Sequence, residues 1–404
     1  MGLLERLFSK APSRDEFAQI VIRALADKGI SSTHYNPKEF SIVGDDTNTI
    51  FLENSFVTYC KAGIEQRARI LEHLVGTFAE KTTIPPRFAA ALPSLMPIVR
   101  ASSYFSLVEL HLKTRSADVD VSKLACQKKQ LADGLAVVIA YDTEHSIMQV
   151  NQETFDGWGV SFDDALVAAK DNLREKTDKR LITEVSPGVY QGAWNDSYDS
   201  ARMLLTDFIN GLPLDGAPVV FVPNRDQLWL TGNRNIAGLK HVLKAGGESH
   251  FLPHPLSPSL YLLNDGAWGA YFPENAALRE QCLNLQRRRE AMDYGQQQDS
   301  LKIIYEREKR DVFLATYTVF QRQDGSQYST CVWSNGVDSS LPKADMITFF
   351  TATPKKWHIT VPWGAAFPIV AGLMEQQEGL EPVRYRVSAY PNPEQIAALR
   401  RAAV

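Results

Sequence analysis

Six charged residues of this 404-residue chain have types and positions that could support chemistry: Arg100, Asp142, Asp196, Asp199, Arg202 and Arg225. Each stands near the end of a predicted strand or the start of a predicted helix, where α/β proteins tend to place ligands. Two carboxylates with nearby arginines could hold a metal ion, or bind a phosphate or carboxylate ligand. On this interpretation the chain would be a small-ligand sensor or an enzyme.

The same residues also fit a structural role. Asp196 is suited to cap a helix, and Asp199 would then take the third helical position, where the helix dipole favours a negative charge. Arg202 follows Asp199 by three residues, which is ion-pair spacing on a helix. Under this alternative, replacing Asp199 by Ala would lower stability by about 1 kcal/mol. The sequence leaves both interpretations open.

Other catalytic signatures are missing from the sequence. There is no GxSxG elbow, no Walker A loop and no GxGxxG after a strand, so we name no catalytic residue and expect no cofactor. His241, His250 and His254 are close in sequence, but Pro253 and Pro255 flank His254 and oppose a shared helical face. We therefore expect structural or surface histidines and no metal site.

The composition indicates a packed protein of the cytoplasm. Hydrophobic residues make up 44% of the chain and charged residues 22%, and 43 basic against 47 acidic residues give a net charge of −4. A nucleic-acid binder usually has a basic excess, so nucleic acid is not the expected partner. Four widely spaced cysteines fit reduced thiols better than a disulfide framework. No apolar run approaches the ~18 residues of a membrane span.

The pattern of elements predicts a mixed α/β or α+β fold with a central sheet and flanking helices, followed by a smaller α+β module. Residues 135–141 form a continuous apolar run, typical of a buried strand. Two hairpins are expected in the core, the first joining residues 218–222 to 227–231 and the second turning on Asn264-Asp265-Gly266, and a third is expected around Gln323-Asp324-Gly325 in the C-terminal module. A helix over 274–293 precedes a polar stretch at 294–300 that resembles a boundary. We therefore predict a helical and mixed region at 1–92, a core at 93–293 and a C-terminal module at 300–404.

Four short stretches resemble the YtpQ-like family of bacterial proteins. They are Met96–Ser103 (MPIVRASS), Ala169–Arg174 (AKDNLR) after Tyr141-Asp142, Asn195–Arg202 (NDSYDSAR), and Val222–Asp226 (VPNRD) leading to Asn233-Arg234-Asn235. They follow the family's order and spacing over about residues 15–275, and the segment after residue 300 lies outside the match. The resemblance implies a bacterial, cytoplasmic protein, and it carries no mechanism because no activity is established for the family.

The C-terminal module is rich in aromatic residues. Its tryptophans are Trp333, Trp357 and Trp363, and exposed aromatic residues often anchor protein partners. Core packing is the alternative role for each. We expect Trp357 and Trp363 to be the first places to look for a protein-binding rim. The sequence thus favours a non-catalytic protein-binding or adaptor protein, with the ligand sensor or enzyme as the alternative and the oligomeric state open.

Overall fold

The computed structural model describes residues 11–44, 49–79, 83–115, 126–144, 146–247, 249, 252–352 and 356–403. It confirms the predicted α+β class. The chain divides into two compact units. The first unit contains Met1–Pro97, Ile139–Lys176 and Phe251–His254, and the second contains Ile98–Val138, Thr177–His250 and Pro255–Val404. Each unit thus draws on separate stretches of chain, whereas the sequence suggested three contiguous domains.

The N-terminal part of the first unit packs three helices with a small antiparallel sheet. The helices are α2 (Arg14–Asp27), α3 (Glu53–Lys61) and α4 (Ile64–Ala79), and the strands are β1 (Thr33–Asn36), β2 (Ser41–Gly44) and β3 (Thr49–Phe51). Helix α2 begins with a capping box: Ser13 Oγ accepts from the Glu16 amide, and the Glu16 carboxylate accepts from the Ser13 amide. Its buried side chains Phe17, Val21 and Leu25 enter the core of this part.

The remaining elements of the first unit surround a second core. They are α5 (Phe88–Ala91), η1 (Leu92–Ser94), β7 (Ile147–Gln149), α8 (Gln152–Trp158) and α9 (Phe162–Glu175). The core includes Leu95, Ile139 and Phe155. Strands β4 (Leu95–Ala101) and β6 (Leu135–Asp142) run from one unit into the other. They belong to a sheet of order β4-β6-β5, with β7 paired to β6, and β5 spans Lys129–Ala132. The first six residues of β6 are buried, as its apolar run predicts.

A six-stranded antiparallel sheet is the largest sheet of the second unit. Its strands are β8 (Ile182–Ser186), β9 (Val189–Gly192), β10 (Pro218–Phe221), β11 (Trp229–Gly232), β12 (Leu260–Asn264) and β13 (Ala267–Tyr271). Their order is β13-β12-β10-β11-β9-β8, and the two hairpins predicted in the core are confirmed as β10–β11 and β12–β13. The accompanying helices are α6 (Ser102–Arg115), η2 (Lys179–Leu181), η3 (Ser200–Leu204), α10 (Thr206–Asn210) and α11 (Ile236–Gly247).

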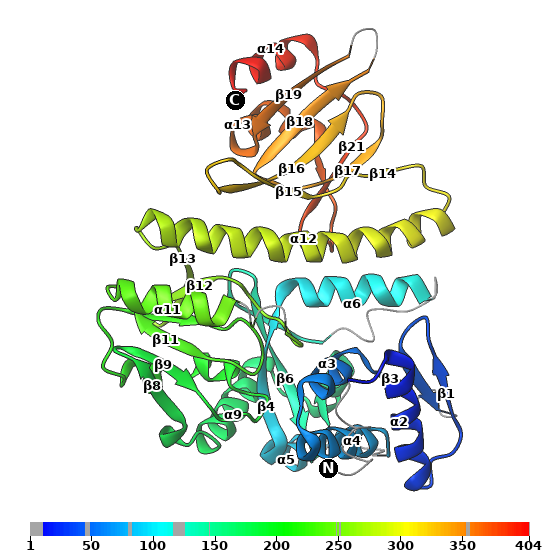
Figure 1. Ribbon diagram of the computed structural model, residues 1–404, viewed down its shortest axis with the longest axis vertical. Helices are drawn as coiled ribbons and strands as arrows, with labels where there is room; N and C mark the ends of the chain where they lie inside the picture. Colours follow the sequence, from blue (N-terminus) through cyan, green and yellow to red (C-terminus); the bar gives the residue numbers. More distant parts are fainter. Residues whose placement is uncertain are drawn as a thin grey trace. The chain divides into compact units, whose positions relative to one another are not determined.

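Helix α12 (Ala276–Arg307) is a continuous helix of 32 residues (Figure 1). The sequence predicted that this helix would end at residue 293, with a boundary at 294–300, and that prediction is wrong. Tyr294 and Gln297 lie inside the supposed boundary, yet both side chains are buried. The Tyr294 hydroxyl donates to the Val383 carbonyl at 2.8 Å, and the Gln297 amide donates to the Pro382 carbonyl at 2.8 Å. Tertiary contacts therefore hold this polar stretch in the helix.

The C-terminal module follows α12 within the second unit. One sheet has the order β15-β16-β18-β19, and the other has the order β14-β17-β21-β20. The strands are β14 (Phe313–Leu314), β15 (Thr318–Gln321), β16 (Gln327–Ser334), β17 (Ser339–Pro342), β18 (Met346–Thr351), β19 (Trp357–Pro362), β20 (Glu375–Gln376) and β21 (Arg384–Val387). The helices are α13 (Trp363–Val370), η5 (Ala371–Leu373) and α14 (Pro393–Arg401), and both α13 and α14 contact β19 (Figure 1).

Within the described part of the chain, no helix combines the length and apolar content needed to cross a membrane.

Candidate functional site

Arg202 and Asp196 form a partly buried, two-pronged ion pair in the second unit. The Arg202 Nη1 donates to Asp196 Oδ1 at 2.9 Å, and Nη2 donates to Oδ2 at 2.7 Å. The Arg202 Nε donates to Thr177 Oγ1 at 3.0 Å, and the guanidinium lies 4.2 Å from the centroid of a Trp194 ring. Arg202 is fully buried. Because each edge of the guanidinium already has an acceptor, this pair stabilises the local fold and leaves little capacity for a ligand.

The backbone around Asp196 is a loop and not the helix start that the sequence predicts. Asn195 and Ser197 both adopt left-handed backbone angles, with φ of 52° and 70°. The Asp196 carboxylate accepts from the amide of Tyr198 at 3.0 Å, which closes a tight turn two residues long. The short helix η3 begins later, at Ser200. Left-handed residues cannot continue a right-handed helix, so the predicted cap at Asp196 is wrong.

Asp199 carries a buried carboxylate with one satisfied oxygen. Its Oδ1 accepts from the Trp194 amide at 3.1 Å, whereas its Oδ2 has no hydrogen-bond partner in the part of the chain that the structure describes. Burial raises the pKa of Asp199 to about 6, and the nearby negative charge of Asp196 contributes to the rise. The side chain makes no capping bond to η3. Asp199 is therefore an electrostatically costly group at neutral pH.

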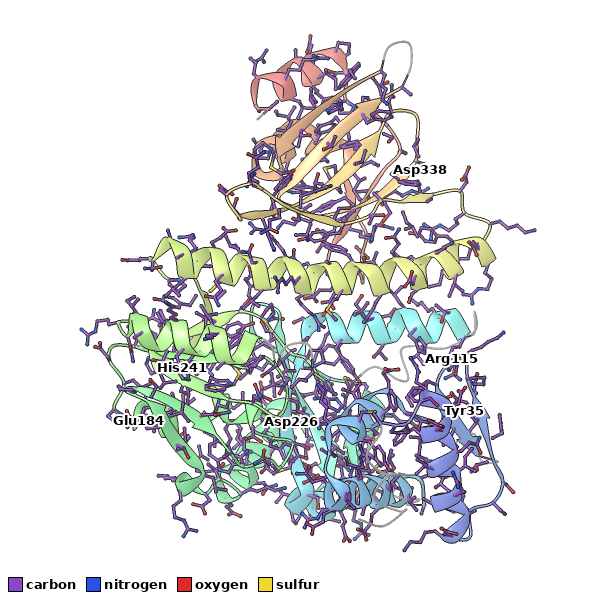
Figure 2. The ribbon with its side chains drawn as sticks, viewed as in Figure 1. Tyr35, Arg115, Glu184, Asp226, His241 and Asp338 are labelled. Atoms are coloured by element: carbon purple, nitrogen blue, oxygen red, sulfur yellow. The ribbon has the colours of Figure 1, made fainter. Side chains whose placement is uncertain are left out.

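Arg100 and Arg225 bring two positive charges together beside this loop. Arg225 pairs with Asp226, whose Oδ1 lies 2.9 Å from Nε, and its carbonyl accepts from the Ser200 amide at 3.1 Å (Asp226 is labelled in Figure 2). Arg100 is the penultimate residue of strand β4, and its guanidinium lies 5.7 Å from the Tyr104 ring centroid. Burial lowers the pKa of Arg100, and the positive charge of Arg225 lowers it further. An anion could relieve this repulsion.

Asp142 belongs to the first unit and is described with it. Its carboxylate lies 3.2 Å from Lys176 Nζ. Both residues line a pocket of about 290 Å³, whose lining is Pro93, Ser94, Met96, Asp142, Asn172, Glu175 and Lys176. Asn172 is held in place because its amide donates to the carbonyls of Leu92 and Leu95, at 2.8 Å each. The stretches Met96–Ser103 and Ala169–Arg174 therefore both contribute residues to this pocket.

The predicted constellation thus separates into parts with different chemistry. Five of its six residues lie in the second unit, and two of these, Asp196 and Arg202, neutralise each other. Arg225 is paired with Asp226, so Arg100 is left as the group that could bind a small anion. Among the described residues, no cluster of three histidine, cysteine or acidic side chains has the geometry to hold a metal ion. His250 lies outside the described residues.

The two tryptophans proposed for a binding rim lie on the core side of the C-terminal module. Trp363 is 8% exposed, and its ring centroid lies 6.3 Å from that of Phe367. Trp357 is partly buried against the module's core, with its ring centroid 6.5 Å from Tyr390 and 4.9 Å from the Arg400 guanidinium. Burial leaves Trp363 little surface for a partner, because its area is already used for packing.

The opposite face of the same sheet was not identified from the sequence. Side chains alternate across a strand, so the neighbours of the core residues Cys331, Trp333 and Phe349 must point the other way. Strand register places nine such residues together, and we call them the outer sheet face: Thr318, Phe320, Tyr328, Thr330, Val332, Thr348, Phe350, His358 and Thr360. None is acidic, and none is lysine or arginine.

Strand β16 explains why the sequence did not reveal this face. Its Tyr-Ser-Thr-Cys-Val-Trp-Ser sequence carries apolar residues in both phases of the alternation, so a period of two cannot say which side is buried. The structure resolves the ambiguity: Trp333 is fully buried, and its neighbour Val332 is 42% exposed.

Comparisons with protein-family models, curated proteins and solved structures find no match for this chain.

Proposed function

We propose that this chain is a non-catalytic protein-binding protein whose partner docks on the outer sheet face. The observation that carries the proposal is the exposure of large apolar side chains on a face without formal charges. Phe320 is 47% exposed and Val332 is 42% exposed, and hydroxyl and aromatic side chains surround them. A contiguous surface of this kind is typical of an interaction site, since isolated proteins rarely expose large apolar patches.

The charges at the margin of the outer sheet face fit the same function. The Arg322 guanidinium lies 4.5 Å from the Tyr328 ring centroid, and the Lys356 ammonium lies 6.0 Å from the Phe350 ring centroid. Protein interfaces commonly combine a centre depleted of charge with a polar rim, and aromatic residues and arginine are enriched in them. A flat sheet face packs best on another flat surface, about 10 Å away. The expected partner therefore presents a sheet or a similarly flat apolar surface.

The test is affinity purification of the tagged chain at native expression, followed by mass spectrometry. Val332→Lys places a charge at the middle of the outer sheet face, whereas Val337→Lys is a matched control. Val337 is a valine of similar exposure in the turn after β16. We expect a near-stoichiometric partner that is lost with Val332→Lys and retained with Val337→Lys. Equal thermal midpoints of the two variants would show that the fold is intact.

Two results would contradict this proposal. One is a chain recovered alone and monomeric by light scattering. The other is a partner that binds the Val332→Lys variant as strongly as the native chain. A dimer that Val332→Lys dissociates would instead identify the partner as a second copy of this chain.

The alternative function, a small-ligand sensor or enzyme, has narrower support. It rests on the charge of Arg100, buried beside that of Arg225, and on the Asp199 Oδ2, which has no hydrogen-bond partner among the described residues. Calorimetric titration with inorganic phosphate tests it directly. Binding that Arg100→Gln abolishes, and that Arg401→Gln on the exposed end of α14 does not, would favour this function over protein binding.

A further inference from the structure

A second pocket, in the second unit, lies where three segments meet. The segments are the end of α6, the end of α12 and residues 377–380, and α6 and α12 contact each other (Figure 1). The pocket has a volume of about 340 Å³. This is near the lower end of the roughly 300–1,000 Å³ typical of small-molecule sites. It lies apart from the outer sheet face, and the proposed function does not use it.

The floor of the pocket is apolar. Leu110, Leu301 and Ile304 line it, and all three are members of a buried hydrophobic cluster that Leu380 covers. Tyr305 forms an aromatic wall, and its hydroxyl accepts from the Gln377 amide at 2.9 Å. A floor of this composition favours an aliphatic chain over a polar ligand, because each methylene placed on it leaves water.

The rim of the pocket carries charges of both signs, because Lys113, Arg307 and Arg310 line it together with Glu308 and Glu378, and one of its cations is available. Lys113 is paired with Glu109 at 2.7 Å, and Arg310 is paired with Glu308 at 3.4 Å. Arg307 differs: it donates to the Thr114 carbonyl at 3.5 Å, and no carboxylate pairs with it in the described ranges of the chain. A guanidinium has five N–H donors in a planar fork, so Arg307 retains the capacity to bind a carboxylate on two prongs.

The helix ends account for part of this positive charge but not for the pocket. Helices α6 and α12 both end here, and basic residues offset the partial negative charge of a helix C-terminus. That effect explains why Lys113 and Arg307 are basic. The helix-dipole effect does not explain why a pocket with an apolar floor lies beside these two residues.

We propose that this pocket binds a small amphipathic carboxylate, with its aliphatic chain on the Leu110, Leu301 and Ile304 floor and its carboxylate on Arg307. The apolar floor would contact the aliphatic chain of such a molecule, and Arg307 would bind its carboxylate. A neutral alcohol would satisfy the floor alone, and an amine of the same length would meet the Arg307 charge with repulsion.

The experiment uses the full chain and three probes of equal length: octanoate, octanol and octylamine. Calorimetry should show octanoate binding at least about tenfold more tightly than octylamine, since a charge-assisted hydrogen bond of this kind corresponds to about one or two powers of ten in affinity. Arg307→Gln should weaken octanoate binding by about tenfold while leaving octanol binding unchanged. Arg401→Gln, a control at an exposed arginine, should change neither.

Three outcomes would overturn the proposal. They are no binding of octanoate, equal binding of octanoate and octylamine, and octanoate binding that Arg307→Gln does not weaken. A further variant, Leu380→Gln, should weaken both octanoate and octanol by making the floor polar. If it weakened neither, the probes would be bound elsewhere.

Discussion

The carboxyl group of Asp199 should make the folded protein less stable at neutral pH than at mildly acidic pH. The pKa of Asp199 is about 6 in the fold, against an ordinary value of 3.8. Between these values the folded state keeps a proton that the unfolded chain releases, so this group's contribution to stability falls as pH rises through the window. A difference of about two pH units corresponds to about 3 kcal/mol. Asp199→Asn removes the titration but keeps an Oδ1 acceptor for the Trp194 amide.

Urea unfolding of the native chain and of Asp199→Asn, followed by tryptophan fluorescence from pH 4 to 7.5, measures this effect. The difference in unfolding free energy should move by about 3 kcal/mol in favour of the variant as pH rises from 4 to 7. Asp265→Asn, in an exposed hairpin turn, controls for the loss of one carboxylate. Parallel stability profiles for native chain and Asp199→Asn would refute the reasoning, because the buried carboxyl group would then have no raised pKa.

Three further predictions concern one ion pair and two glycines. Arg202→Met should lower the free energy of unfolding by about 3–5 kcal/mol because it leaves the Asp196 charge without its Arg202 partner, and adding Asp196→Asn should recover part of the loss. Urea unfolding measures both changes. A loss below about 1 kcal/mol would mean that the ion pair contributes no more than an exposed pair does. Gly295→Ala should raise the thermal midpoint, by about 0.5–1 kcal/mol of stability, since it lies inside α12 with open space around its Cβ position. Gly232→Ala should lower the thermal midpoint, because the new Cβ would clash with the Asp215 backbone. Equal midpoints for the two alanine variants would contradict both expectations.

Local turn and cap chemistry predicted much of the fold. The β12–β13 hairpin turns on Asp265 and Gly266, which both adopt left-handed angles, and an Asp-Gly pair is suited to that turn. Helix α14 begins with Pro393 at its first position and a capping box from Asn392 to Gln395. Such signals need only neighbouring residues, so the sequence alone is enough to find them.

Elements that depend on distant contacts could not be found in this way. Helix α13 ends at Val370, and the short helix η5 and the strand β20 follow it. Within the supposed boundary at 294–300, the Gln297 Oε1 accepts from the Arg384 Nε at 2.6 Å. In the sequence Gln297 resembles a linker residue, because its hydrogen-bond partner Arg384 lies 87 residues further along the chain. No local pattern reports a contact at that separation.

The candidate site was predicted in its location but not in its pairing. Helical spacing predicted an ion pair between Arg202 and Asp199, three residues apart. In the structure Arg202 pairs with Asp196, six residues away, because left-handed residues fold this stretch into a loop. Asp199 therefore lacks the expected partner, and within the described ranges its Oδ2 accepts no hydrogen bond. The sequence showed which charged residues are present, whereas it did not show the backbone conformation that decides which of them pair.

Helix α12 shows why residues 300–404 are not a structurally separate module. Its first half gives Leu278 and Cys282 to the core beneath the six-stranded sheet, and its last turns give Leu301 and Ile304 to the cluster under the amphipathic pocket. Between them, Tyr294 enters the core of the C-terminal module. One helix thus contributes to three clusters at successive points along its length, which explains why it lacks a single apolar stripe and resembles a solvated linker in the sequence. A division at residue 300 would separate the module from part of its own core, so α12 belongs structurally to the module as much as to the sheet before it.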